Sequence, residues 1–208
     1  MKAIGIFLVK LAVFAGVYLC WRWVADRHFV IGAGVAVVWG GIAVVPLVGL
    51  AARWLLNRKP TPQRAALLLV PVHALELILL GCGLIVGFPL MRDHPWMHVP
   101  LPRVISQPLV EIFGVLAFLA VLNLAARGLG LPFAAVLSRK LATDWLYARC
   151  RNPMGLMTLL CCLAGAAWLQ SLHALVWVVC WLSPAWILYV KLYEERELEV
   201  RFGTPSLD

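Results

Sequence analysis

Charged residues are scarce in this chain: only 13% of its 208 residues are Asp, Glu, Lys or Arg, whereas 63% are hydrophobic. An ordinary soluble domain carries about 25% charged residues, because its surface must be solvated by water. The composition therefore excludes an ordinary soluble globular protein. It also leaves no polar stretch long enough for a separate soluble domain, so we expect a single membrane region.

Cysteine is present, but in no arrangement typical of disulfides or metal sites. None of the six cysteines forms a Cys-x-x-Cys pair, and five lie in or at the ends of apolar stretches. We interpret them as small buried hydrophobic side chains. The sequence predicts neither a disulfide framework nor a cysteine metal centre at these positions, which are Cys20, Cys82, Cys150, Cys161, Cys162 and Cys180.

Acidic residues are also few, with 10 Asp and Glu against 18 Lys and Arg, which gives a net charge of +8. We do not read this as a nucleic-acid surface, because the basic residues sit in short loops between apolar runs. In such loops they set the topology of a membrane protein and meet anionic lipid headgroups. We therefore expect membrane lipid, and no nucleic acid, as a partner.

Long apolar runs dominate the chain, and a run of about 18 residues or more can cross ~30 Å of hydrocarbon. The first run contains Lys10 and has no small-residue cleavage site at its end, so we predict a permanent span and not a signal peptide. The fold class predicted is all-α, a polytopic helix bundle with about six transmembrane helices. These spans are residues 3–24, 29–50, 65–90, 108–126, 153–169 and 172–193.

The distribution of Lys and Arg predicts the orientation. With the N-terminus inside, the inner loops and tails hold thirteen of these residues and the outer loops four, with Lys10 inside the first span. We therefore expect a bacterial inner membrane with both termini cytoplasmic. The last two spans then form a hairpin with a tight outer turn near Gln170 and Ser171. Their inner ends, at Asn152 and Glu194, are expected to meet at the cytoplasmic surface.

Two polar segments flank this hairpin. The first reads Leu-Ala-Thr-Asp-Trp-Leu-Tyr from Leu141, followed by Arg-Asn-Pro-Met-Gly from Arg151. The second reads Glu-Glu-Arg-Glu-Leu from Glu194 and ends in Phe-Gly at Gly203. In their order and spacing these segments resemble the isoprenylcysteine carboxyl methyltransferase family and the related membrane phospholipid methyltransferases. The resemblance covers residues 127–203. In that family His stands where this chain has Asn152, and Tyr stands where it has Gly155.

The resemblance implies that S-adenosylmethionine binds at the cytoplasmic end of the hairpin and that its methyl group passes to a lipophilic acceptor. Basic side chains would hold the cofactor carboxylate, Glu194 its ammonium group, and Tyr147 its adenine. Arg151 would steer an anionic acceptor and is the expected catalytic residue; no metal is expected. The cofactor-binding residues implied are Arg139, Lys140, Leu141, Ala142, Tyr147, Asn152, Pro153, Met154, Gly155 and Glu194. Residues 1–126 would form an N-terminal four-helix region, and 127–208 the methyltransferase-like region.

Other interpretations rest on polar residues inside the spans, which are costly in a membrane and often functional. His73 and Glu76 share one face of the third span, and pairing between them, or of Glu76 with Lys10, would satisfy buried groups. Lys10, His73, Glu76 and Glu111 could instead form the core of a small transporter or channel. A non-catalytic family member and a nicotinamide-dependent sterol reductase are further alternatives. Gly83-x-x-x-Gly87 is typical of close helix packing.

Overall fold

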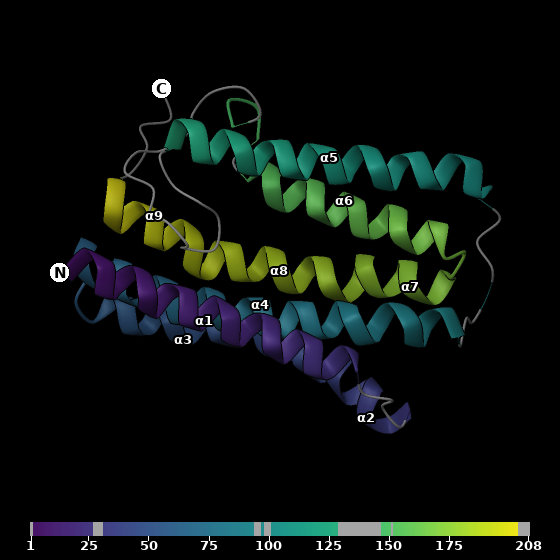
Figure 1. Ribbon diagram of the computed structural model, residues 1–208, viewed down its shortest axis with the longest axis horizontal. Coiled ribbons are helices and arrows are strands. Elements are labelled where there is room, and N and C mark those ends of the chain that lie inside the picture. Colours follow the sequence, from purple (N-terminus) through teal and green to yellow (C-terminus); the bar gives the residue numbers. More distant parts are fainter. Residues whose placement is uncertain are drawn as a thin grey trace. The chain divides into compact units, whose positions relative to one another are not determined.

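The structure is a computed structural model that describes residues 2–26, 31–93, 97, 101–128, 147–150 and 152–203. These residues are almost entirely helical, which confirms the predicted all-α fold (Figure 1). The helices are α1 (Lys2–Ala25), α2 (Ile31–Val35), α3 (Ile42–Asn57), α4 (Pro62–Asp93), α5 (Arg103–Gly128), α6 (Pro153–Trp168), α7 (Leu172–Trp177), α8 (Ser183–Tyr189) and α9 (Glu195–Phe202).

Among the described residues, three π-helical turns interrupt the α-helical runs without ending them. They are η1 (Ala36–Gly41), η3 (Val178–Leu182) and η4 (Val190–Glu194). The run from Leu172 is therefore one helix of 31 residues that continues to Phe202. It extends past the end at residue 193 that the sequence predicted, so that the acidic residues from Glu194 onward are helical.

Several of the helical runs suggest an integral membrane protein. Among the described residues, five are long and apolar enough to cross a membrane: 8–25, 33–57, 62–93, 103–123 and 172–202. Helix α6 is apolar but has only 16 residues, in agreement with the short fifth span that the sequence predicted. Large apolar side chains lie open on the helix surfaces, as at Leu67 and Val104, which are 76% and 78% exposed. Water disfavours such surfaces, whereas lipid tails solvate them.

The described residues divide into two compact units. One contains residues 2–26, 31–86 and 185–203, and the other contains 87–93, 97, 101–128, 147–150 and 152–184. The predicted division near residue 126 separates regions by function and stays a prediction.

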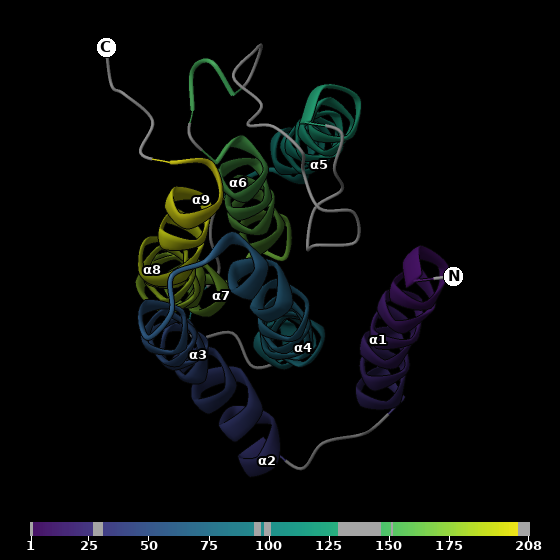
Figure 2. The same ribbon diagram turned by 90° about the vertical axis from the view of Figure 1, so that its left-hand side faces the viewer.

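In the first unit, α3 lies beside η4 and α9 (Figures 1 and 2). Gly49 of α3 allows the close approach, because a Cβ there would lie 3.2 Å from the Tyr189 ring. Arg196 of α9 donates from Nε to Oδ1 of Asn57 over 3.0 Å, and so links the C-terminal end of α3 to the first turn of α9. Tyr189 and Tyr193 have no exposed surface and form the core between these helices.

Helix α4 contacts α1 and the helical run of α2–α3 through glycines. The Trp21 indole of α1 donates to the carbonyl of Leu77 over 2.9 Å, and its ring occupies the space that a side chain at Gly81 would need. A Cβ at Gly83 would come within 2.6 Å of Ile42. The first glycine of the predicted Gly-x-x-x-Gly pair is therefore a packing residue, as expected.

In the second unit, α5 and α6 lie side by side (Figures 1 and 2). The connection from α6 to α7 is a tight turn, in which Gln170 has a positive φ of 55°. Ser171 caps α7 by accepting the N–H of Ala174, and its hydroxyl donates to the Met91 carbonyl over 2.9 Å. The predicted hairpin turn at Gln170 and Ser171 is thus confirmed.

We expect Gly81→Ala to destabilise the protein, because the added methyl group would displace Trp21 and break its hydrogen bond to Leu77. Overpacking of this kind costs about 1–3 kcal/mol. Gly16→Ala in α1 is the matched control, since a Cβ there meets nothing within 4 Å. Thermal unfolding in detergent should show a lower midpoint for Gly81→Ala and no loss for Gly16→Ala. Equal midpoints for the two variants would contradict this packing.

Candidate functional site

About half of the predicted site residues fall within the described part of the chain. Tyr147 lies half-buried in the turn 147–149, and Asn152 to Gly155 begin α6. Glu194 is the last residue of η4. The remaining predicted residues lie outside the described residues: Arg139, Lys140, Leu141, Ala142 and Arg151.

Helix α6 begins with a side-chain cap. Asn152 has non-helical backbone angles, with φ −133° and ψ 73°, and its Oδ1 accepts the N–H of Gly155 over 2.9 Å. Pro153 occupies the first helical position, where its fixed φ suits the helix and its missing N–H costs nothing. The Arg-Asn-Pro pattern found in the sequence therefore marks a well-defined helix start.

Asn152 and Gly155 contact each other at this helix start. A Cβ at Gly155 would lie 3.0 Å from Oδ1 of Asn152, so a larger residue at 155 would disturb the cap. Gly155 has no side chain, and it therefore leaves room for the Asn152 side chain to cap the helix.

This cap reduces the number of backbone donors available to an anion. The N–H of Gly155 donates to the Asn152 side chain, the N–H of Leu156 donates to the Asn152 carbonyl over 3.0 Å, and Pro153 has none. Within the first turn, the amide of Met154 is the donor that the cap does not engage. The amides at the start of a helix can form an anion site; here the cap takes part of that capacity.

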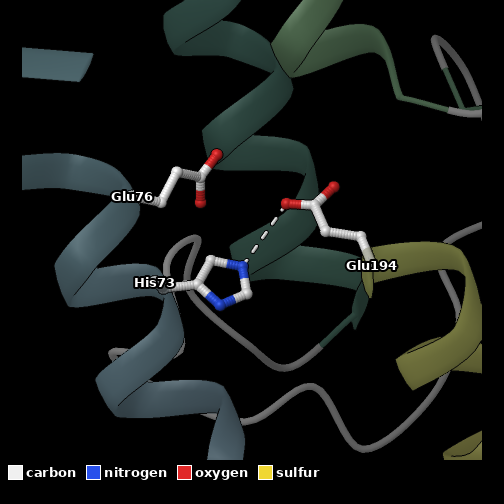
Figure 3. A group of neighbouring side chains, drawn as sticks. All are labelled: His73, Glu76 and Glu194. Atoms are coloured by element: carbon white, nitrogen blue, oxygen red, sulfur yellow. Dashed lines mark ion pairs between the residues drawn. The ribbon is translucent and has the colours of Figure 1, made fainter. Parts of the chain in front are cut away.

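Glu194 belongs to a cluster that the sequence did not predict (Figure 3). Its Oε1 lies 3.4 Å from Nε2 of His73 on α4, and Glu76 lies one turn further along the same helix. One ligand atom from each of the three residues lies within 4.8 Å of the other two. All three residues belong to the first unit.

The expected pairing of Glu76 with His73 or Lys10 stays a prediction. His73 forms an ion pair with Glu194, and neither carboxylate oxygen of Glu76 has a hydrogen-bond partner among the described residues. The pairing of His73 with Glu194 follows from the orientation of the imidazole. Its Nδ1 lies 2.9 Å from the Leu69 carbonyl one turn earlier, which directs Nε2 away from α4 and toward η4.

Aromatic side chains enclose the cluster. The rings of Tyr189 and Tyr193 each meet the His73 ring edge-on, with centroids 6.2 Å apart. One turn beyond Glu194, the buried Glu197 accepts from Arg201 over 2.7 Å. The C-terminal helix therefore presents one carboxylate that is neutralised by an arginine and another that faces a histidine.

Glu111, grouped with these residues in the transporter interpretation, has a different environment. It is exposed on α5 and accepts a hydrogen bond from Gln107, one turn earlier, over 3.1 Å. Lys10 is partly buried on α1. The part of the chain that the structure describes thus gives His73 and Glu76 a common site with Glu194, which a sequence reading could not identify because η4 is remote from α4 along the chain.

Comparison of the chain with protein-family models, with curated proteins and with solved structures finds no match.

We expect Asn152→Ala to lower stability by about 1 kcal/mol, the usual value of a lost N-terminal cap. Asn152→Ser is the matched control, because a serine hydroxyl can accept the same Gly155 N–H. Thermal unfolding in detergent should place Asn152→Ser close to the native protein and Asn152→Ala below it. If the alanine variant were as stable as the serine variant, the cap would not be contributing.

Proposed function

We propose that this protein binds S-adenosylmethionine and transfers its methyl group to a lipophilic acceptor at the cytoplasmic membrane face. The observation that carries the proposal is the pair of motifs at the two ends of the apolar hairpin. The first motif supplies the capped start of α6 at Asn152, and the second supplies the helical segment from Glu194 to Phe202. Gly203, with a positive φ of 83°, ends that helix at the Phe-Gly position of the motif.

The charges in the two motifs match those of the cofactor. S-adenosylmethionine carries a carboxylate, an ammonium and a sulfonium group. Arg151 in the first motif, and Arg139 and Lys140 directly before it, are basic and suit the carboxylate. The second contributes Glu194, whose carboxylate suits the ammonium group. The amide of Met154 and the side-chain amide of Asn152 are further donors at the start of α6.

Methyl transfer itself asks little of the protein in proton chemistry. A nucleophilic oxygen, sulfur or nitrogen of the acceptor forms a bond to the methyl carbon, while the bond from that carbon to the sulfonium sulfur breaks. Its electron pair stays on the sulfur, which leaves neutral S-adenosylhomocysteine. Catalysis then depends on in-line positioning and on exclusion of water. Arg151 would orient an anionic acceptor such as a carboxylate.

A lipophilic acceptor is favoured by the surroundings. The helices that carry the motifs are apolar, and the run Leu172–Phe202 is long enough to cross a membrane. Large apolar side chains on that run are exposed, among them Ile187 and Leu188 of α8. An acceptor dissolved in the bilayer could reach such a site laterally. The excess of Lys and Arg in the loops that include residues 127–152 supports the cytoplasmic side.

Titration of the purified protein with S-adenosylmethionine in detergent should show saturable binding. We expect Glu194→Gln to weaken it by roughly 10- to 100-fold, since a hydrogen bond to a charged group contributes about 1.5–3 kcal/mol. Glu199→Gln is the matched control, because that carboxylate sits in a half-exposed pair with Arg196 on the same helix. Calorimetry measures both affinities.

Absence of binding to the native protein would refute the proposal, as would equal affinities for the two glutamine variants. Incubation of membranes with a cofactor labelled in its methyl group, followed by lipid extraction, should then reveal the acceptor as the labelled species. Competition with a nicotinamide cofactor distinguishes methyl transfer from the sterol reductase alternative.

A further inference from the structure

The cluster of His73, Glu76 and Glu194 has a feature that the methyl-transfer proposal leaves unexplained. Glu76 is only 1% exposed, yet neither of its carboxylate oxygens has a hydrogen-bond partner among the described residues. A buried carboxylate without a hydrogen-bond partner is costly, because it loses its hydration. Figure 3 shows this carboxylate directed toward the space that His73 and Glu194 also face.

The orientation of His73 defines what can occupy that space. The Leu69 carbonyl can only accept a hydrogen bond, so the Nδ1 that faces it over 2.9 Å must carry the proton. In a neutral imidazole Nε2 is then an acceptor. It faces Oε1 of Glu194, which is also an acceptor. Two facing acceptors require a cation between them, which is either a proton or a metal ion.

The distance between these two atoms fits a metal ion as well as a proton. Hydrogen bonds from nitrogen to oxygen have lengths of about 2.7–3.2 Å. The separation of Nε2 and Oε1 is longer, at 3.4 Å. Two ligands of a tetrahedral zinc ion, each bonded at about 2.1 Å, lie about 3.4 Å apart. The hydrogen bond from Nδ1 to a backbone carbonyl is also the usual support of a metal-binding histidine.

Charge and surroundings agree with this interpretation. A neutral imidazole and two carboxylates carry two negative charges, which one divalent cation neutralises within an apolar bundle. A nitrogen ligand favours zinc or a similar transition metal over Mg²⁺ and Ca²⁺, which prefer oxygen ligands. The hydroxyls of Tyr189 and Tyr193, both close by, are buried and have no hydrogen-bond partner in the described part of the chain. They are available to a metal-bound water or to the carboxylates.

We propose that His73, Glu76 and Glu194 bind one divalent transition-metal ion, Zn²⁺ by first expectation, through Nε2 and one oxygen of each carboxylate. A fourth position would be open to water or to another ligand. The ion would join α4 to η4 and would stabilise the first unit in proportion to its occupancy. This site does not depend on methyl transfer, although Glu194 serves both proposals.

The test uses the full chain in detergent, stripped with a chelator and titrated with Zn²⁺. We expect the native protein to bind one Zn²⁺ ion at the cluster. Glu76→Gln should bind that ion at least tenfold more weakly, roughly the loss seen when a metal site is disturbed. Subtracting the Zn²⁺ bound by Glu76→Gln from that bound by the native protein removes the contribution of the six cysteines, which both proteins contain. Glu111→Gln is the matched control, because it removes an exposed carboxylate outside the cluster.

Thermal unfolding gives a second readout. Zn²⁺ should raise the midpoint of the native protein and of Glu111→Gln, but not that of Glu76→Gln. In the stripped state Glu76→Gln should be at least as stable as the native protein, because the substitution removes a buried carboxylate that has no partner. The stripped native protein could instead have a higher unfolding midpoint than Glu76→Gln, with no shift of that midpoint on adding Zn²⁺. That result would mean that a proton and not a metal ion occupies the cluster.

Should Glu76→Gln fail to fold, Co²⁺ added to the stripped native protein gives the answer. Tetrahedral Co²⁺ with nitrogen and oxygen ligands absorbs visible light without the charge-transfer band of a thiolate ligand. Appearance of that spectrum, and its loss in His73→Gln, supports the site; its absence from the native protein overturns the proposal. Zn²⁺ binding and S-adenosylmethionine binding are separate measurements, and Asn152→Ser should affect only the second, so either proposal can fail alone.

Discussion

A polar group inside an apolar helix bundle has to find its partner within the protein, because lipid offers none. The backbone meets this constraint by forming helices throughout the described spans. Side chains meet it individually: Trp21 donates to Leu77, Ser171 to Met91, and Arg201 to Glu197. Among the described residues Glu76 is an exception, as are the hydroxyls of Tyr189 and Tyr193. The two carboxylate oxygens of Glu76 are buried without a hydrogen-bond partner among the described residues. This is the reason for proposing a ligand in the cluster of His73, Glu76 and Glu194.

Much of this architecture could be predicted from the sequence. Helix length and hydrophobicity are local properties, so the predicted spans coincide with helical runs, and α6 is short as expected. The turn at Gln170 and the helix start at Pro153 were also predictable, since glutamine followed by serine between two apolar runs and Asn-Pro before one are local signals. The helix after Tyr193 was cut short in the prediction because its charged residues resemble a loop.

The cluster could not be predicted because it depends on which face each helix turns toward its neighbour. Spacing along α4 brings His73 close to Glu76 on one face, and pairing between them was the natural expectation. The Leu69 carbonyl engages one ring nitrogen of His73 and leaves the other facing Glu194. No pattern in the sequence reveals that choice. By contrast, the cofactor proposal rests on ordered motifs, and the structure adds the caps at Asn152 and Gly203 that support them.

The π-helical turn η4 has an evolutionary consequence. A π-turn accommodates one more residue than an α-helical turn, and such turns are frequent at functional sites. Deleting one residue from Val190–Glu194 would restore the ordinary pitch and leave the helix beyond it facing nearly the same way, because five residues at π pitch turn about as far as four at α pitch. A single codon inserted into an ancestral α-helix would thus be enough to create the bulge that ends at Glu194 without turning Glu197 and Arg201.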